Sequence, residues 1–185
     1  MINLKYKPTI QGIKVILRPF KEGDVEYMEE CFKDKDVIKL TGSSLEYDIE
    51  AVKNWYNTRN DQVNRLDLAI VDNSNNVVVG EVVLNEYDEV NHSMNFRILI
   101  GPRGRDRGLG SEATVLIRDY IFINTDLKQL TLGVYAFNPR AQKVYEKAGF
   151  IIESVTKDDF TYEGEMIDCL NMVLTRDNWE KIINK

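Results

Sequence analysis

The sequence predicts a mixed α/β fold of the α+β type, with a central, mostly antiparallel sheet flanked by helices. Apolar runs separated by turn residues fill much of the first half of the chain, as is typical of hairpin strands. Two segments with apolar residues at helical spacing lie in the second half, and the first of them joins two strands. Because such a β-α-β connection makes its two strands parallel, we expect one parallel pair in the sheet.

The first half should contain a short strand, two helices and a set of hairpin strands. Val15–Leu17 is the short strand, and helical spacing follows Asp24, a candidate N-cap. A second helix is expected over Ile49–Tyr56. The hairpin strands are Leu66–Val71, Val77–Leu84 and His92–Ile100, with turns at Asp72–Asn76 and Asp88–Asn91.

The second half should alternate helices with strands. A helix over Leu109–Asn124 has an apolar face that must pack on the sheet. Asn138 and Pro139 are preferred residue types for an N-cap and a first helical position, and Gly149 is typical of the residue that follows a helix. The remaining elements are strands Leu130–Phe137, Phe150–Val155 and Met166–Leu174, the turn Tyr162–Gly164, and a terminal helix over Asp177–Ile183.

Composition indicates one domain without a metal site. The 185 residues are 43% hydrophobic and contain no linker or repeat, so we expect a single domain over residues 1–185. The formal net charge of -6 argues against a nucleic-acid partner and leaves room for a cationic one. The chain has one histidine, His92, and Cys31 and Cys169 form no CxxC pair, so we expect no metal and interpret both cysteines as inert core thiols.

The sequence offers no targeting or membrane signal. No segment resembles a signal peptide or reaches the about 20 apolar residues that a membrane span requires. We therefore expect cytoplasmic residence and no membrane partner. The oligomeric state stays open, a homo-oligomer included.

A glycine-bearing loop between the strand ending at Ile100 and the helix starting at Leu109 is the most informative local pattern. It reads Arg105-Asp-Arg-Gly108-Leu-Gly110-Ser111. The first backbone N–H groups of the following helix have no intrahelical partner and point outward, so they form an anion site suited to phosphate. Taken alone, the loop also fits a solvated basic turn.

A second motif follows on the next predicted helix. It reads Asn138-x-x-Ala141-x-x-x-Tyr145-Glu146-Lys147-x-Gly149-Phe150. Together with Arg105-x-x-Gly108-x-Gly110, it resembles the two signature motifs of the GCN5-related N-acetyltransferase (GNAT) family, whose members use acetyl-CoA. Leu17-Arg18-Pro19, Gly23-Asp24, Gly80, Glu86 and Phe96 are similar to residues of the ribosomal-protein and spermidine acetyltransferase branch, and the resemblance runs from Ile16 to Leu174.

The resemblance implies acetyl-CoA as acyl donor, with loop N–H groups on its diphosphate. The implied coenzyme residues are Leu99, Ile100 and Gly101 at the strand end, Arg105, Asp106, Arg107, Gly108, Leu109, Gly110 and Ser111 in the loop and first helical turn, and Asn138, Arg140, Ala141 and Tyr145 in the second motif. Arg105 and Arg107 would add positive charge, and the strand end would pair with the pantetheine arm. Asn138 would bond the pantetheine amides, although helix capping alone also explains it.

The resemblance also implies a direct attack of an amine on the thioester, without a covalent enzyme intermediate. A backbone N–H near Ile100 would stabilise the developing oxyanion, and Tyr145 would protonate the departing thiolate. From its spacing alone, Tyr145 is a core residue on an apolar helix face. Glu86 is the first candidate for the base that deprotonates the amine, with Glu81 second; the alternative is that both belong to a solvated strand edge.

Several positions depart from the family pattern. Asp106 stands where many relatives have Gly, which places an anion near the expected phosphates unless it points to solvent or bonds Arg103 or Arg107. Ser43-Ser44 stand where spermidine acetyltransferases carry paired acidic residues, and Asn95 stands where Glu is common. The acceptor therefore stays open between a polyamine, a protein N-terminus or peptide, and another small amine.

Two other functions fit parts of the sequence. One is a non-catalytic acyl-CoA-binding regulatory module that keeps the fold without turnover. The other is an NAD-binding oxidoreductase, because Gly108-Leu-Gly110-Ser-Glu-Ala113 matches the G-x-G-x-x-A fingerprint. Against the second, Gly101–Arg107 separate the fingerprint from its strand, and no acidic residue ends the strand that follows.

Overall fold

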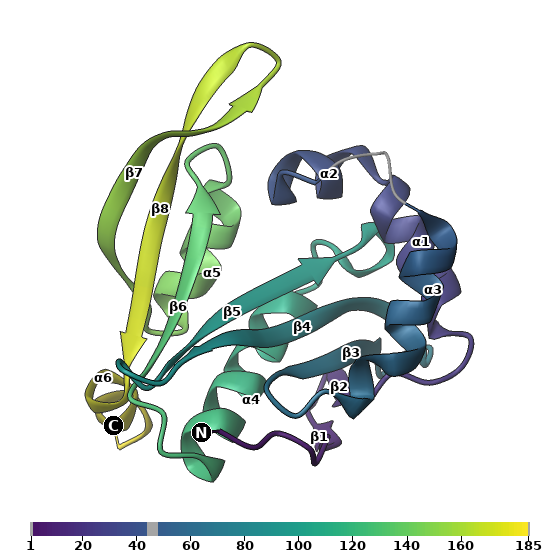
Figure 1. Ribbon diagram of the computed structural model, residues 1–185, viewed down its shortest axis with the longest axis horizontal. Helices are drawn as coiled ribbons and strands as arrows, with labels where there is room; N and C mark the ends of the chain where they lie inside the picture. Colours follow the sequence, from purple (N-terminus) through teal and green to yellow (C-terminus); the bar gives the residue numbers. More distant parts are fainter. Residues whose placement is uncertain (1, 44–47, 185) are drawn as a thin grey trace.

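A computed structural model describes residues 2–43 and 48–184 and arranges their strands in one twisted sheet (Figure 1). The strand order is β1-β2-β3-β4-β5-β6-β8-β7. Among these described residues, β5 and β6 are parallel and all other neighbours are antiparallel. The predicted α+β class, with one parallel pair around the glycine-loop helix, is confirmed.

The elements follow the predicted order with two additions, a short first strand and a short helix. The strands are β1 (Ile10–Gln11), β2 (Val15–Arg18), β3 (Leu66–Asp72), β4 (Val77–Asp88), β5 (Ser93–Ile100), β6 (Gln129–Tyr135), β7 (Ile151–Tyr162) and β8 (Glu165–Thr175). The helices are α1 (Asp24–Lys33), α2 (Lys35–Thr41), α3 (Ile49–Thr58), α4 (Leu109–Asn124), α5 (Pro139–Lys147) and α6 (Arg176–Ile183), with short 3-10 turns η1 (Arg59–Asp61) and η2 (Pro102–Gly104). The bounds of α4 are those the sequence predicts.

The unpredicted helix α2 has a capping residue at each end. Asp34 caps it by accepting the Val37 N–H at 2.9 Å, and Gly42 ends it with a left-handed φ of 64°. Only seven residues lie between these two, too few for a hydrophobic period to stand out.

Three other expectations about the elements were wrong in detail. Asp24 is the first residue of α1 and Gly23 is its N-cap, while the Asp24 carboxylate bonds Arg18 at 2.6 Å and the Lys21 N–H at 2.7 Å. β7 continues to Tyr162, seven residues past the predicted end at Val155, and β8 exceeds the predicted Met166–Leu174 by one residue at each end. Register shifts after Ile152 and after Thr156 break the alternation that would have revealed the length of β7.

The sheet separates two hydrophobic clusters. Alternate residues of β3 face opposite sides, so Leu68 and Ile70 join the cluster under α4 and α5, while Ala69 and Val71 join the cluster under α1 and α3. The described helices include none that is long and apolar enough to cross a membrane. The described side chains also contain no group of three or more His, Cys, Asp or Glu residues placed to hold a metal ion.

The parallel pair opens into a fork. β5 and β6 are paired only from Ser93–Asn95 to Gln129–Thr131, although both strands continue beyond these residues. In Figure 1 the two ribbons diverge above the paired residues, and α2 lies over the opening. The main-chain edges of both strands that face each other beyond this point are therefore free of sheet partners among the described residues.

Candidate active site

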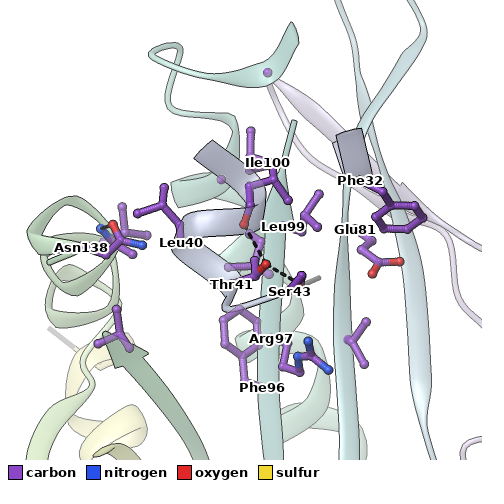
Figure 2. Close-up of a pocket in the computed structure, with 18 of the residues that line it drawn as sticks. Phe32, Leu40, Thr41, Ser43, Glu81, Phe96, Arg97, Leu99, Ile100 and Asn138 are labelled. Atoms are coloured by element: carbon purple, nitrogen blue, oxygen red, sulfur yellow. Dashed lines mark hydrogen bonds between the residues drawn. The ribbon is translucent and has the colours of Figure 1, made fainter. Parts of the chain in front are cut away.

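The fork opens onto a cavity of about 870 Å³. At one end, which we call the loop end, the walls are residues 104–106 and 108–111 and the start of α5. At the other end, which we call the α3 end, the walls are α2, α3 and the facing parts of β4 and β5. Figure 2 shows this second part of the cavity, with Thr41 and Ser43 from the α2 side facing residues of β4 and β5. The two ends are thus lined by different elements of one cavity, whose volume lies in the range of small-molecule sites.

The N-terminus of α4 forms the floor of the loop end. Its N-cap is Gly108, which has a left-handed φ of 78°, and no described side chain accepts a capping hydrogen bond from the first N–H groups of the helix. A helix start without a side-chain cap keeps its first N–H groups available for an anion. Within the described chain this end therefore has the form of a phosphate site, as the glycine loop predicts.

The strand edge beside this helix start carries further main-chain donors. Gly101 donates its N–H to the Val79 carbonyl on β4 at 2.8 Å. Since main-chain groups of a strand point alternately to its two sides, the Ile100 N–H faces the open edge toward β6. Leu99 and Ile100 line the cavity there.

The arginines of the glycine loop are held by carboxylates of the protein. Arg105 forms ion pairs with Asp34, the N-cap of α2, and with Asp36 at 3.0 Å. Burial tends to raise the pKa of Asp34, but the hydrogen bonds from Arg105 and from the Val37 and Asp36 N–H groups, together with the charge of Arg105, outweigh it, so the pKa lies below its usual value. Arg107 pairs with Asp72 at 2.5 Å in the β3–β4 turn. Their guanidinium groups are engaged away from the helix start, so the loop end binds mainly through its backbone.

Asp106 spans the mouth of the loop end. It adopts a left-handed φ of 62° and pairs with Arg140 of α5 at 2.8 Å. Of the alternatives that the sequence left open, solvent exposure of Asp106 is confirmed, whereas an ion pair with Arg103 or Arg107 is not found; Arg103 pairs with Glu30 at 2.7 Å. The two motifs are thus joined by one exposed ion pair across the cavity.

Tyr145 lies between the two ends. Asn138 caps α5 by accepting the Ala141 N–H at 3.1 Å, and the helix turns Tyr145 toward the sheet. The ring of Tyr145 meets Phe96 and Phe150 edge-on, at centroid distances of 6.0 Å and 6.1 Å. Burial raises the pKa of Tyr145 to about 12, so its phenol stays protonated at physiological pH.

The α3 end contains a charged network. Arg59 is buried, pairs with Asp67 at 2.6 Å and Glu81 at 2.7 Å, and stacks over Tyr56 at 4.4 Å. Arg65 holds Asp67 with two hydrogen bonds of 2.6 Å and 2.7 Å. The Tyr56 hydroxyl and Arg59 both donate to the same oxygen of Glu81, Oε2, at 2.9 Å and 2.7 Å. No described group is recorded as a donor to Glu81 Oε1, and Glu81 lines the cavity.

The structure gathers most of the predicted site residues on this cavity. Those that line it are Leu99, Ile100, Arg105, Asp106, Gly108, Leu109, Gly110, Ser111, Asn138, Arg140, Ala141 and Tyr145. Gly101 and Arg107 do not line it; Gly101 packs against Cys31 instead. Glu86 is exposed at a left-handed φ of 53°, at the register shift between the Asn85–Asn95 and Asp88–Ser93 pairs of β4 with β5, and does not line the cavity either. The structure therefore does not bring Glu86 to Tyr145, whereas it brings Glu81 to the same cavity.

Several lining residues had no signal in the sequence. Trp55, Tyr56, Arg59, Arg65 and Arg97 belong to no motif, and only the fold places them together. Cys169, which the sequence assigned to the core, is half-buried and lines the cavity, while Cys31 is buried as expected. Ser43 lines the cavity, and Ser44, the second position of the acidic pair in relatives, lies outside the described residues.

Comparison with protein-family models gives one match that covers most of the chain. The model described as an acetyltransferase (GNAT) domain matches residues 14–151. The match includes the glycine loop and the second motif, so it covers both walls of the loop end.

Comparison with individual proteins gives similar results. The spermidine N(1)-acetyltransferase of Vibrio cholerae serotype O1 is 22% identical over 167 residues, which cover 90% of this chain and 95% of the relative. The enzyme of the same name from Escherichia coli K12 is 26% identical over 168 residues, covering 90% and 88%. Among solved structures, spermidine N-acetyltransferase from Vibrio cholerae in complex with CoA and spermine superposes with a TM-score of 0.82 at 21% identity, covering 90% of this chain and 98% of that one.

Proposed function

The chain belongs to the GNAT acetyltransferases and uses acetyl-CoA, and from that premise we propose that it acetylates a primary amine with Tyr145 as proton donor. The observation that carries this proposal is the shared cavity: the uncapped helix start, the open strand edge and Tyr145 all face it. The acetyl donor supplies an activated thioester when bound. The residues of this chain then need to hold the donor, orient an amine and provide one proton.

Main-chain groups fit the donor at the loop end. The N–H groups at the start of α4 would hold its diphosphate, because charge-assisted hydrogen bonds to backbone donors are strong. The open edge of β5 would pair with the amide groups of the pantetheine arm as a neighbouring strand does. The Ile100 N–H on that edge would donate to the thioester carbonyl.

Tyr145 would give its proton to the thiolate that leaves. Its raised pKa keeps the phenol protonated, so the proton is present whenever the donor binds. A thiol has a reference pKa of about 8.5, well below that of this phenol, so the transfer is favourable only together with cleavage of the C–S bond. Position therefore matters more than acidity, and the contacts with Phe96 and Phe150 fix that position.

We assign the role of base, which takes a proton from the acceptor amine, to Glu81 in place of Glu86. Oε2 of Glu81 is fixed by Tyr56 and Arg59, while Oε1 is free of recorded donors and can accept a proton of the amine directly or through water. The relatives named spermidine acetyltransferases support a small-molecule amine as acceptor over a protein N-terminus.

A thiol-release assay tests the proposal. The purified chain is incubated with acetyl-CoA and a panel of polyamines, amino acids and short peptides, with reactions lacking amine as blanks. We expect release of free thiol that depends on the amine. Binding of acetyl-CoA without thiol release for any amine would contradict the proposal and support a non-catalytic acyl-CoA-binding module. A thermal shift with NAD and none with acetyl-CoA would instead support the dinucleotide interpretation of Gly108–Ala113.

A further inference from the structure

The α3 end is poor in free negative charge. Its two buried or half-buried carboxylates, Asp67 and Glu81, are matched by the guanidinium groups of Arg59 and Arg65. The other described carboxylate that lines this end, Asp48, caps α3 by accepting the N–H groups of Glu50 and Ala51 at 2.9 Å and 3.2 Å. The described part of this end therefore offers little unmatched negative charge to a ligand with several cations.

Arg97 adds an unmatched positive charge to this end. It lies on β5, is exposed and lines the cavity. No residue in the described ranges 2–43 and 48–184 forms a recorded ion pair or hydrogen bond with its guanidinium group. A guanidinium group carries five donors in a planar fork that suits a carboxylate.

Arg97 and Glu81 face the cavity from the same side of the sheet. Arg97 is directly opposite Val83, and Leu99 is directly opposite Glu81, so all four side chains share one face. Glu81 and Arg97 are diagonal neighbours on adjacent strands, a relation that separates Cα atoms by about 7–8 Å. Figure 2 shows the two side chains on neighbouring strands at the α3 end. A free carboxylate oxygen and a free guanidinium group thus lie within reach of one small molecule.

We propose that the acceptor amine carries a carboxylate, with Glu81 holding the ammonium group and Arg97 binding the carboxylate. This inference rests on the proposed acetyl transfer and names the class of its acceptor: an amino acid or a similar short zwitterion. Trp55 and Val83 supply apolar walls for the carbon chain between the two charges. A linear polyamine would instead place a second cation near Arg97, which has no carboxylate to offer it.

Neighbouring positions agree with this assignment. Asn95, which stands where relatives commonly have Glu, bonds the neutral Asn85 at 3.0 Å and adds no negative charge to the cavity. Among residues 2–43 and 48–184, the charges that face an acceptor at this end are therefore one carboxylate oxygen of Glu81 and the guanidinium group of Arg97.

Matched pairs of acceptors test the proposal in the thiol-release assay at saturating acetyl-CoA. The pairs are L-lysine with 1,5-diaminopentane, L-ornithine with 1,4-diaminobutane, and L-lysine with L-lysinamide, with spermidine as a further acceptor. We expect kcat/KM to be about tenfold or more higher for each carboxylate-bearing member, as charge-assisted bonds to Arg97 predict. Equal or higher values for the members without a carboxylate, or for spermidine, would overturn the proposal.

The variant Arg97→Gln separates the role of Arg97 from chain length and general charge. We expect it to lower kcat/KM for L-lysine by about tenfold and to change that for L-lysinamide by less than about twofold. The matched control is Lys53→Gln on α3, which removes a cation outside the cavity and should leave kcat/KM for L-lysine and for L-lysinamide unchanged. Arg97→Lys should restore part of the preference, because it restores the charge without the planar fork. An unchanged lysine-to-lysinamide ratio in Arg97→Gln would overturn the proposal.

A binding measurement distinguishes this inference from the proposed catalysis. Calorimetric titration of L-lysine and L-lysinamide into the CoA-loaded chain, and into its Arg97→Gln variant, reads the carboxylate preference without turnover. Preferential binding of L-lysine that Arg97→Gln removes, in the absence of thiol release, would support the carboxylate site and contradict the catalytic proposal. Thiol release without preferential binding of L-lysine would support the catalytic proposal and contradict the carboxylate site.

Discussion

The two ends of the cavity are built in different ways. The loop end presents backbone N–H groups at the start of α4 and along β5, and its arginines are bound to carboxylates of the protein. The α3 end presents side chains, with Arg59, Arg65 and Glu81 in one network and Arg97 free of a recorded partner. A backbone site depends on local chain geometry, whereas a side-chain site depends on residues brought together from distant parts of the sequence. The loop end therefore places few demands on side-chain identity, whereas the α3 end depends on particular side chains.

The largest expected effect is the pH dependence of turnover, which should follow the acceptor amine and not Tyr145. The acceptor amine, with a reference pKa of about 10.4, must lose a proton before it attacks, so kcat/KM for the acceptor should rise by about tenfold per pH unit between pH 7 and 9. Tyr145 should cause no descending limb in this range, because burial raises its pKa to about 12 and the phenol stays protonated. A fall in kcat below pH 10 that is absent from Tyr145→Phe would show that the tyrosine ionises earlier.

Removal of the phenol hydroxyl should affect chemistry and spare coenzyme binding. We expect Tyr145→Phe to lower kcat by about tenfold or more while leaving the Kd for acetyl-CoA nearly unchanged, because the ring still packs on Phe96 and Phe150. Tyr120→Phe on α4 is the matched control, since Tyr120 does not line the cavity. Equal turnover of Tyr145→Phe and the unmodified chain would remove the tyrosine from the mechanism.

A change at the glycine loop should weaken coenzyme binding. Gly108→Val forces a β-branched residue into a φ of 78° and places a side chain where phosphate would approach, so we expect acetyl-CoA affinity to fall by about tenfold. Gly164→Val in the β7–β8 turn is a matched control for backbone strain, with a φ of 88° and open space around it. Both variants should lose thermal stability, but calorimetry should detect weaker acetyl-CoA binding only in Gly108→Val. A similar loss of acetyl-CoA affinity in both variants would mean that backbone strain causes the loss in Gly108→Val.

The smallest expected effect is at Asp106. Asp106→Asn removes an anion from the loop end and releases Arg140, so acetyl-CoA should bind about two to three times more tightly at low salt and equally at high salt. Asparagine tolerates the left-handed φ of this position. Asp158→Asn is the control, because Asp158 is also exposed at positive φ but lies on β7. Weaker binding in Asp106→Asn would mean that the Asp106–Arg140 pair helps to form the site.

The same contrast determines how far the sequence predicts the molecule. Local signals suffice for α4, for the Asn138 cap of α5 and for the position of Gly149 after that helix, and these elements form the loop end. The opening of the fork is not local, because it depends on β5 and β6 losing their pairing after Asn95. The preference for Glu86 over Glu81 also failed to anticipate the geometry, since strand alternation puts Glu86 on the face opposite to Glu81, and Glu86 itself lies at a register shift of β4.

The side-chain contacts of the α3 end could be predicted less well from the sequence. Arg59 reaches Asp67 and Glu81 from a 3-10 turn, and nothing in its sequence neighbourhood marks it as a partner of β4. Arg97 reads as an ordinary exposed residue of an alternating strand until the cavity around it is known. Long-range ion pairs of this kind depend on the packing of whole helices on the sheet, so local patterns do not contain them.

The salt bridge between Arg105 and Asp34 has a mechanical consequence. It fastens the turn that would hold the coenzyme to the N-cap of α2, the helix that lies over the opposite part of the cavity. A displacement on one side is therefore transmitted to the other through a single guanidinium group. In kinetic terms the two substrates are not independent, and saturation with one should shift the apparent Michaelis constant of its partner.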